Sequence, residues 1–224
     1  MLGGKNIEKS YGKHKVLHNV NFSVENNKIV GIFGLNGSGK TTLLRILSGL
    51  DGYFKGVLEK TDFADVAYMA VDNISPPEMR VKDLVEFYAT FLPNQNTQKI
   101  LEELKESKIK EKSRLRNLSS GMRQYVKFLL TVYSGASVCL FDEPLTNLDV
   151  NLREKIVQTM IEEIGEERLF IITTHEIKEV ERIIDGFYIL KDGTLSEYYE
   201  SDVVIDETGK SIEEFYKEKV NAND

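Results

Sequence analysis

The stretch 34–42 has residue types and a spacing that could bind the phosphates of a nucleotide. It reads Gly-Leu-Asn-Gly-Ser-Gly-Lys-Thr-Thr, and it fits the pattern of Gly, four residues of any type, then Gly-Lys-Ser/Thr. Glycines let successive backbone N–H groups converge on one anion, because no β-carbon obstructs the approach. Lys40 is expected to reach the β- and γ-phosphates, and the Thr41 hydroxyl to ligate Mg²⁺. The other residues expected to line the phosphates are Asn36, Gly37, Ser38, Gly39 and Thr42.

The segments on either side supply the context that this motif requires. Residues 29–33 are an apolar run that predicts a buried strand, and residues 42–47, rich in Leu and Ile, predict a helix. A helix starting here would direct the positive end of its dipole at the same anion as the loop amides. We therefore interpret 34–42 as a nucleotide-phosphate site and not as a glycine-rich turn before an ordinary helix.

Two carboxylates follow a second apolar strand, which is predicted over residues 138–141. They are Asp142 and Glu143. In phosphate-loop enzymes an aspartate in this place holds Mg²⁺, and the adjacent glutamate could polarise the attacking water as a general base. An apolar run followed by Asp-Glu could also be a solvated acidic loop. The phosphate loop decides between the two, so Asp142 is predicted as a metal ligand and Glu143 as the base.

The pattern along the chain predicts how these residues are positioned. Strands alternate with helices, which indicates an α/β fold with a mainly parallel sheet and a site at the carboxyl ends of its strands. Residues 9–12 read as a turn, and 16–24 alternate as a half-buried strand. Short strand-like pieces at 56–59 and 66–69 suggest a small antiparallel sheet near the N-terminus.

Prolines 76 and 77 end this pattern, and helical periodicity follows them. Residues 76–134 are interpreted as a helical lobe inserted into the core, which comprises 1–75 and 135–200, with 201–224 as a tail. The later elements expected are helices at 150–164, 176–184 and 211–220, a strand at 169–173, and a hairpin around 191–194.

Composition limits the possible partners and location. The chain has 224 residues and a formal net charge of −7, which argues against nucleic acid as a partner. No apolar run approaches the roughly 20 residues of a membrane span, and nothing at the N-terminus resembles a signal peptide. Cys139 lies in an apolar run and is expected to be a buried packing residue. His14 and His18 are expected at the surface, and the protein is expected in the cytosol.

Further motifs resemble those of ABC transporter ATPases. Residues 118–122, Leu-Ser-Ser-Gly-Met, resemble the signature motif of that family, and 145–149, Leu-Thr-Asn-Leu-Asp, resemble its D-loop. His175 resembles the switch histidine, and Tyr11 lies where the family stacks an aromatic ring on adenine. In order, spacing and identity these motifs cover the chain from about residue 11 to about residue 193.

This resemblance implies a phosphate-loop core of the RecA-like type, ATP and Mg²⁺ as ligands, and ATP hydrolysis. It implies a head-to-tail dimer with a second ATP-binding subunit, the same chain or a close relative. Ser119 and Gly121 would cap the γ-phosphate on the other subunit, and Asp149 would communicate across the dimer. His175 would contact the γ-phosphate and act with Lys40 and Glu143 in catalysis. A separate integral membrane permease would be the other partner, with the chain peripheral at the inner face of the cell membrane.

One departure from the family pattern concerns metal binding and coupling. The family usually has a glutamine where the core meets the helical lobe, and residues 68–73 contain none. Val71 aligns best with it, and we hypothesise that the adjacent Asp72 takes over metal contact or coupling. Residues 72–80 are the expected docking face for the permease. Met122 and the stretch 84–93 are similar to subunits that export drugs, peptides or bacteriocins.

Two alternatives stay open at this point. A soluble ABC-type ATPase acting on DNA or ribosomes would be expected to have a basic face, long coiled-coil or zinc insertions, or two tandem cassettes, and the sequence has none of these features. A regulatory subunit that binds ATP with weak turnover is disfavoured by the intact Lys40, Asp142, Glu143 and His175. The missing glutamine keeps that second alternative open.

Overall fold

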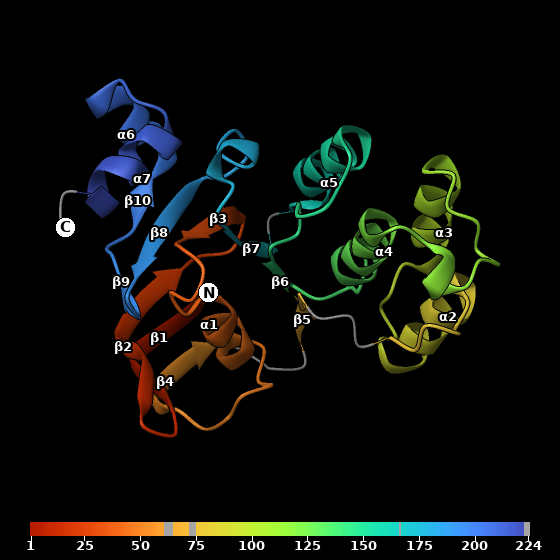
Figure 1. Ribbon diagram of the computed structural model, residues 1–224, viewed down its shortest axis with the longest axis horizontal. Helices are drawn as coiled ribbons and strands as arrows, with labels where there is room; N and C mark the ends of the chain where they lie inside the picture. The colour runs from red at the N-terminus through yellow and green to blue at the C-terminus, as the bar shows by residue number, and fades with distance from the viewer. Residues whose placement is uncertain (61–64, 72–74, 166, 222–224) are drawn as a thin grey trace.

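A twisted sheet runs through the middle of the protein (Figure 1). The predicted site lies at the carboxyl ends of its central strands. The structure is a computed structural model that describes residues 1–60, 65–71, 75–165 and 167–221. The strands of this sheet lie in the order β10 (Tyr199–Glu200), β8 (Gly186–Lys191), β3 (Lys28–Phe33), β7 (Leu169–Thr174), β6 (Val138–Asp142) and β5 (Val66–Met69). From β8 to β5 all neighbours pair in parallel, whereas β10 and β9 (Thr194–Leu195) pair antiparallel with β8. Parallel pairing aligns the carboxyl ends of β3, β6 and β7.

A smaller antiparallel sheet packs beside it, in the order β2 (His14–Val24), β1 (Leu2–Tyr11) and β4 (Lys55–Lys60). The expectation that residues 66–69 belong to this sheet is wrong, because β5 pairs in parallel with β6 of the large sheet. The turn predicted over 9–12 is wrong in its placement, because β1 continues to Tyr11, which pairs with His14. Gly12 and Lys13 make the turn instead, and the φ of 60° at Gly12 is one that glycine adopts without strain. Tyr11 is therefore held at the end of a strand.

The central strands are apolar on both faces because each face covers a core. In β6 the side chains alternate between the two cores, with Cys139 and Phe141 in one and Val138 and Leu140 in the other. This is the period of two expected of a strand. Helices cover one face, and α1 with the small sheet covers the other. Burial on both faces explains why these strands read as continuous apolar runs.

Helices α2, α3 and α4 lie together at one end of the molecule, beyond β5 (Figure 1). With the parallel sheet and the antiparallel N-terminal sheet, they confirm the predicted fold class; the lobe boundaries at 76 and 134 stay a prediction. Within the described ranges, no helix combines the length and the apolar character that a bilayer crossing requires. The helices are α1 (Lys40–Leu47), α2 (Val81–Phe91), α3 (Thr97–Glu106), α4 (Ser120–Val132), α5 (Val150–Glu163), α6 (Ser201–Thr208) and α7 (Ile212–Asn221).

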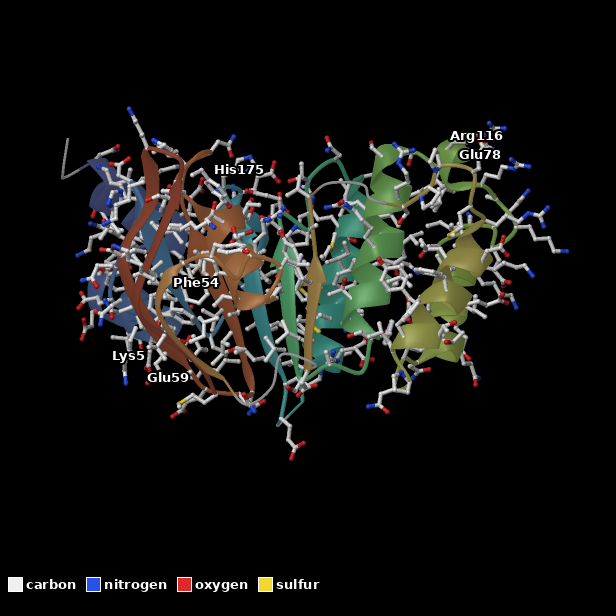
Figure 2. All side chains as sticks on the ribbon, turned by 90° about the horizontal axis from the view of Figure 1, so that it is seen from below. Lys5, Phe54, Glu59, Glu78, Arg116 and His175 are labelled. Atoms are coloured by element: carbon white, nitrogen blue, oxygen red, sulfur yellow. The ribbon has the colours of Figure 1, made fainter. Side chains whose placement is uncertain are left out.

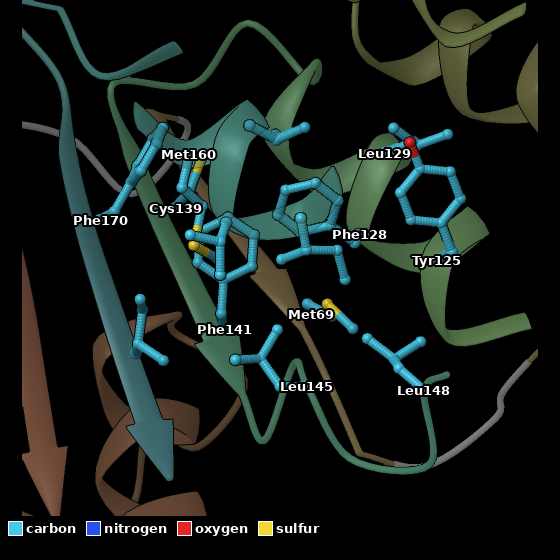
Figure 3. Close-up of a cluster of buried hydrophobic side chains, with 14 of the residues drawn as sticks. Met69, Tyr125, Phe128, Leu129, Cys139, Phe141, Leu145, Leu148, Met160 and Phe170 are labelled. Atoms are coloured by element: carbon cyan, nitrogen blue, oxygen red, sulfur yellow. The ribbon is translucent and has the colours of Figure 1, made fainter. Parts of the chain in front are cut away.

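A row of aromatic rings joins α4 to the sheet (Figure 3). Tyr125 and Phe128 lie on one face of α4, with ring centroids 6.3 Å apart. Phe128 lies 5.4 Å from Phe141 of β6, which in turn lies 5.6 Å from Phe170 of β7. Close packing of this kind transmits displacement, because the interior is dense. Helix α4 is thereby fixed to the strands that end at the site.

Two segments near the C-terminus differ from expectation. The helix predicted over 176–184 is wrong, because the structure has only a 3-10 turn, Ile177–Glu179, followed by further turns. Ile177 and Val180 are buried three residues apart, and the N–H of Val180 donates to the Ile177 carbonyl, which is the spacing of a 3-10 turn. Helix α6 was not predicted. It precedes α7, which covers the charged helix expected at 211–220.

The aromatic row gives a prediction for stability. Phe128→Ala should lower the free energy of unfolding by about 3–5 kcal/mol, because it removes a fully buried ring and leaves a cavity. Phe91→Ala on α2 is the matched control, since Phe91 is 67% exposed and its loss should cost less than about 1 kcal/mol. Urea unfolding of both variants measures the difference, and equal losses would contradict the packing described here.

Candidate active site

The phosphate loop joins the end of β3 to the start of α1, with glycines at the positions that tolerate no side chain. A β-carbon on Gly34 would lie 2.3 Å from the carbonyl oxygen of Leu190, so only glycine fits there. Gly37 and Gly39 have φ of 84° and 110°, a region that other residues rarely adopt. Gly39 then directly precedes α1. The loop therefore curls tightly and places a helix N-terminus at its centre.

Lys40 is enclosed by this loop, with its side chain only 6% exposed. Its Nζ donates to the carbonyls of Gly34 at 2.8 Å and Leu35 at 3.2 Å, and it lies 3.5 Å from Oε1 of Glu143. Ser38 Oγ is buried and has no hydrogen-bond partner in the described part of the chain. A cation with one weak anionic partner and an unsatisfied hydroxyl are features that fit a phosphate group.

Asp142 is fully buried at the end of β6. Its Oδ1 accepts from Thr173 Oγ1 at 2.7 Å, and its Oδ2 accepts from the Tyr68 hydroxyl at 3.1 Å. The parallel register places Thr173 opposite Asp142. Each carboxylate oxygen thus has a donor that fixes its direction, and both keep lone pairs for a further partner.

Glu143 has a left-handed backbone, with φ of 49°, as the chain leaves β6. Its N–H donates to the Thr173 carbonyl at 3.0 Å, and its own carbonyl accepts from Nε2 of Gln124 at 2.9 Å. Its carboxylate oxygens lie 3.0 and 3.1 Å from Nδ1 of His175. An ionised carboxylate can only accept, so Nδ1 of His175 carries a proton in this pair. Figure 2 places His175 at one edge of the molecule.

Lys40, Glu143 and His175 are therefore in contact in that order, with the Glu143 carboxylate between the Lys40 ammonium and the His175 imidazole. An anion entering the loop would compete with Glu143 for both donors. The carboxylate released in this way would be free to accept a proton from water. The arrangement can therefore bind a phosphate and activate a nucleophile next to it.

The fit to a metal ion depends on oxygen donors. Asp142 and the exposed hydroxyl of Thr41 supply hard oxygens at the site. Elsewhere in the described part of the chain, no group of three or more His, Cys, Asp or Glu side chains could hold a metal ion. Mg²⁺ is commonly held by one or two protein oxygens together with substrate phosphates. The residues present fit an ion of that kind. Asp72, the further ligand hypothesised from the sequence, lies outside the described residues.

The signature residues start α4, away from the phosphate loop in the sequence. The Ser119 side chain accepts from the Met122 N–H at 3.1 Å and so caps the helix. Gly121 is buried, and a β-carbon there would lie 2.8 Å from the Asn147 carbonyl oxygen. Asp149 likewise caps α5 by accepting from Leu152 N–H at 3.0 Å. Each of these residues has a local structural role in addition to any role toward a nucleotide.

Tyr11 is fixed at the end of β1 and remains 49% exposed. Its hydroxyl donates to Asp51 at 3.0 Å, and Lys9 Nζ lies 4.7 Å from its ring centroid. Burial raises the pKa of Asp51, but hydrogen bonds from Lys9, the Tyr53 backbone and Tyr11 together lower it below its ordinary value. The ring is therefore held by an ionised anchor, as a base-stacking platform would need to be.

Sequence reasoning missed three residues that support the site. Thr173, Tyr68 and Gln124 each donate to Asp142 or to the Glu143 backbone. The signal for Thr173 was the pair of hydroxyl residues, Thr173 and Thr174, that ends an apolar strand. The sequence held no comparable signal for Gln124. Val71, at the missing glutamine, is exposed, and its carbonyl accepts from Lys127 of α4 at 3.0 Å.

Comparisons with known proteins agree with this geometry. The sequence model of the ABC transporter family matches residues 17–146. An uncharacterised ABC transporter ATP-binding protein of Methanocaldococcus jannaschii is 32% identical over 87% of this chain and 75% of its own length. The aliphatic sulfonates import ATP-binding protein SsuB 1 of Shouchella clausii is 31% identical over 87% of this chain and 78% of its own length.

Solved structures show the same fold. The ATP-binding subunit of an ABC transporter superposes with a TM-score of 0.87 at 23% identity, over 97% of this chain and 98% of that one. A dimeric ATP-binding cassette in a post-hydrolysis state, bound to ADP and Pi, superposes with a TM-score of 0.79 at 23% identity, over 90% of this chain and 99% of that one. The chain therefore belongs to the ABC transporter family, as an ATPase domain that binds and hydrolyses ATP with Mg²⁺.

Proposed function

We propose that this chain is the ATP-hydrolysing subunit of a transporter and works as a head-to-tail dimer on a separate membrane permease. One observation carries the dimer: the chain has two half-sites. Lys40, Glu143 and His175 form one, whereas Ser119 and Gly121 start a helix that packs on the D-loop of its own chain. A second copy would place that helix start over the first half-site. The dimeric form of a structural neighbour supports this arrangement.

Binding of the triphosphate depends on groups that the loop already presents. Lys40 and the loop amides hold the β- and γ-phosphates, and Tyr11 stacks on the base. Lys40 exchanges its contact with Glu143 for one with phosphate oxygen. The loop residues that contact the phosphates are Asn36, Gly37, Ser38, Gly39, Thr41 and Thr42.

Hydrolysis then uses positioning and charge. Glu143 orients the attacking water and accepts its proton, while the Ser119 and Gly121 amides of the partner cap the γ-phosphate. His175 can donate from Nε2 only as the imidazolium or after a tautomer exchange, since Nδ1 carries the proton in the Glu143 pair. Thr41 and Asp142 would hold Mg²⁺, and the ion would supply charge neutralisation on the phosphates. Asp149 fixes the start of α5 at the dimer contact.

Coupling to the permease is assigned to residues 75–80, the described part of the docking face. The backbones of Arg80 and Arg114 form an isolated antiparallel β-bridge. The N–H of Leu115 donates to the Met79 carbonyl at 2.9 Å. Glu78 forms ion pairs with Arg114 and with Arg116, and Figure 2 labels Glu78 and Arg116 side by side. A displacement of 75–80 would therefore reach residue 116 and, just beyond it, the signature motif.

The direction of transport and the cargo are inferred from similarity to other subunits. The similarity of Met122 and of residues 84–93 to exporter subunits supports export of a drug, peptide or bacteriocin-like cargo. A relative named for aliphatic sulfonates import supports the opposite direction. A soluble ATPase without a permease, or a regulatory subunit with weak turnover, would share the same site. Copurification of a membrane partner from the native host would distinguish the proposed transporter subunit from a soluble ATPase without a permease.

The active-site proposal predicts the effect of removing the base. Glu143→Gln should lower kcat by about 100-fold or more with little change in ATP affinity, since a positioned base contributes about 10²–10⁴-fold. With MgATP the variant should also accumulate as a dimer, measured by light scattering after gel filtration. Glu154→Gln, an exposed change on α5, is the control. Wild-type turnover that is already as slow as that of Glu143→Gln would favour the regulatory alternative.

A membrane location is supported by a basic surface at the C-terminal end of α3 and in the residues that follow it. Lys105, Lys108, Lys110 and Lys112 are exposed around a shallow hollow of about 480 Å³, whose lining includes one acidic side chain, Glu111. None of these four lysines has an ion pair within the part of the chain that the structure describes. In a chain of net charge −7, this concentration of cations is local.

The residue types favour a diffuse anionic surface over a specific acidic peptide. Arg114 and Arg116 could bind a carboxylate with fixed geometry, but Glu78 already engages both. The remaining cations are lysines, which are mobile point charges. Anionic lipid headgroups attract such clusters. We assign this lysine surface to the inner face of the membrane.

Vesicle binding tests the assignment. The variant Lys110→Glu with Lys112→Glu should partition to phosphatidylglycerol vesicles at least about tenfold more weakly than wild type, since each cation near an anionic bilayer contributes about 1 kcal/mol. Lys13→Glu with Lys55→Glu changes the net charge equally at the far sheet and should have little effect. Cosedimentation measures both. Equal binding by the two variants, or equal binding to phosphatidylcholine, would contradict the assignment and leave an acidic permease segment as the partner.

A further inference from the structure

Gln124 reaches from the first turns of α4 to the backbone of the residue that we assign as the base. Its Nε2 donates to the Glu143 carbonyl at 2.9 Å and lies 3.5 Å from the Pro144 carbonyl. The contacted atom belongs to Glu143 itself and not to a neighbouring loop. Because the side chain of Gln124 is partly buried, this bond is sheltered from competing water.

The bond acts on a backbone that needs external support. Glu143 has φ of 49°, a conformation that costs a residue with a β-carbon about 1–2 kcal/mol and persists only where the surroundings hold it. On one side its N–H is held by Thr173 of β7 at 3.0 Å. On the other side its carbonyl accepts from Gln124 at 2.9 Å and, at the longer distance of 3.4 Å, from the N–H of Thr146. The direction of the carboxylate therefore depends on both the sheet and the helical lobe.

We propose that Gln124 is a positioning residue for ATP hydrolysis, which holds Glu143 at the angle from which it activates water. This inference rests on the proposed function, because it needs Glu143 to be the base. Gln124 does not touch substrate in this role. It acts through the peptide of Glu143.

The place of Gln124 on α4 adds a connection between the two sites of a dimer. The same helix begins at Ser119 and Gly121, which would face the nucleotide of the partner. Three residues after Gln124 and on the same helical face, Lys127 donates to the carbonyls of Ala70 at 2.9 Å and Val71 at 3.0 Å. A shift of α4 on closing over the partner's nucleotide would thus move the base of its own subunit and the end of β5 together.

The connection also bears on the missing glutamine. In this chain the position aligned with it is occupied by Val71, whose backbone is held by Lys127 of α4. Helix α4 therefore contacts the core at the ends of two strands. Lys127 bonds to the backbone after β5, and Gln124 bonds to the backbone after β6. Of these two side chains, Gln124 contacts the residue assigned as the base, Glu143.

A substitution that keeps length and removes the donor tests the positioning role. Gln124→Met should lower kcat by at least about tenfold, a part of the roughly 10²–10⁴-fold that a positioned base contributes. The KM for ATP and the ATP Kd should stay within about twofold, because the phosphate loop is untouched. Gln158→Met is the matched control, since Gln158 lies on α5, is exposed and donates only to Glu162 among its described contacts.

Rescue and a double-mutant cycle separate positioning from a purely structural role. Gln124→Lys keeps a donor on a long stem and should recover most of the lost kcat. In the Glu143→Gln background, Gln124→Met should change the residual rate by less than about twofold, because the group that it positions is already gone. Thermal unfolding of each variant reports whether a loss of folding contributes.

Several results would overturn the proposal. A wild-type kcat in Gln124→Met would do so, as would a loss that is equally large in the Glu143→Gln background or that is matched by weaker ATP binding. If Gln124→Met does not fold, a kcat in Gln124→Lys no higher than that of Glu143→Gln counts against it. A rate that survives Glu143→Gln unchanged is a different result, since it removes the proposed base and with it the residue to be positioned.

Discussion

Two charged side chains are withdrawn from water at one edge of the sheet, and their burial constrains everything around them. Lys40 is 6% exposed and Asp142 is fully buried. A buried charge without partners destabilises the folded state by several kcal/mol, so the surrounding chain must supply them. Lys40 donates to loop carbonyls and lies beside the Glu143 carboxylate. Asp142 accepts hydrogen bonds from Thr173 and Tyr68. The buried charges that create the site would destabilise the fold if their partners were removed.

The partners come from separate parts of the chain, and the parallel sheet is what brings them together. Strands β3, β6 and β7 are neighbours or next neighbours, so their carboxyl ends share an edge. Aromatic packing from α4 through Phe141 to Phe170 then ties the helical lobe to two of these strands. In β6 and β7, the residues of the apolar core are followed directly by the polar residues of the site. A displacement of the lobe acts on both.

Sequence alone predicted the residues whose chemistry has a strong local pattern. The stretch 34–42 and Asp142 follow apolar runs and have fixed spacing, so both the fold class and their place at a sheet edge could be inferred. The failures have a common physical origin. Residues 176–184 have an apolar spacing that suits either a helix or successive turns, and packing of Ile177 and Val180 decided for turns. Gln124 is one polar residue among several on α4, and only its reach to the Glu143 carbonyl distinguishes it.

Burial of Cys139 has a consequence for how the protein responds to its surroundings. Burial raises the pKa of this thiol to about 11, and the lowering effect of the nearby Arg168 guanidinium is smaller. Since the thiolate is the reactive form, almost none is available at neutral pH. The chain has no other cysteine. Thiol-directed electrophiles should therefore leave Cys139 unmodified while the protein stays folded, so its turnover should not respond to modification of a thiol.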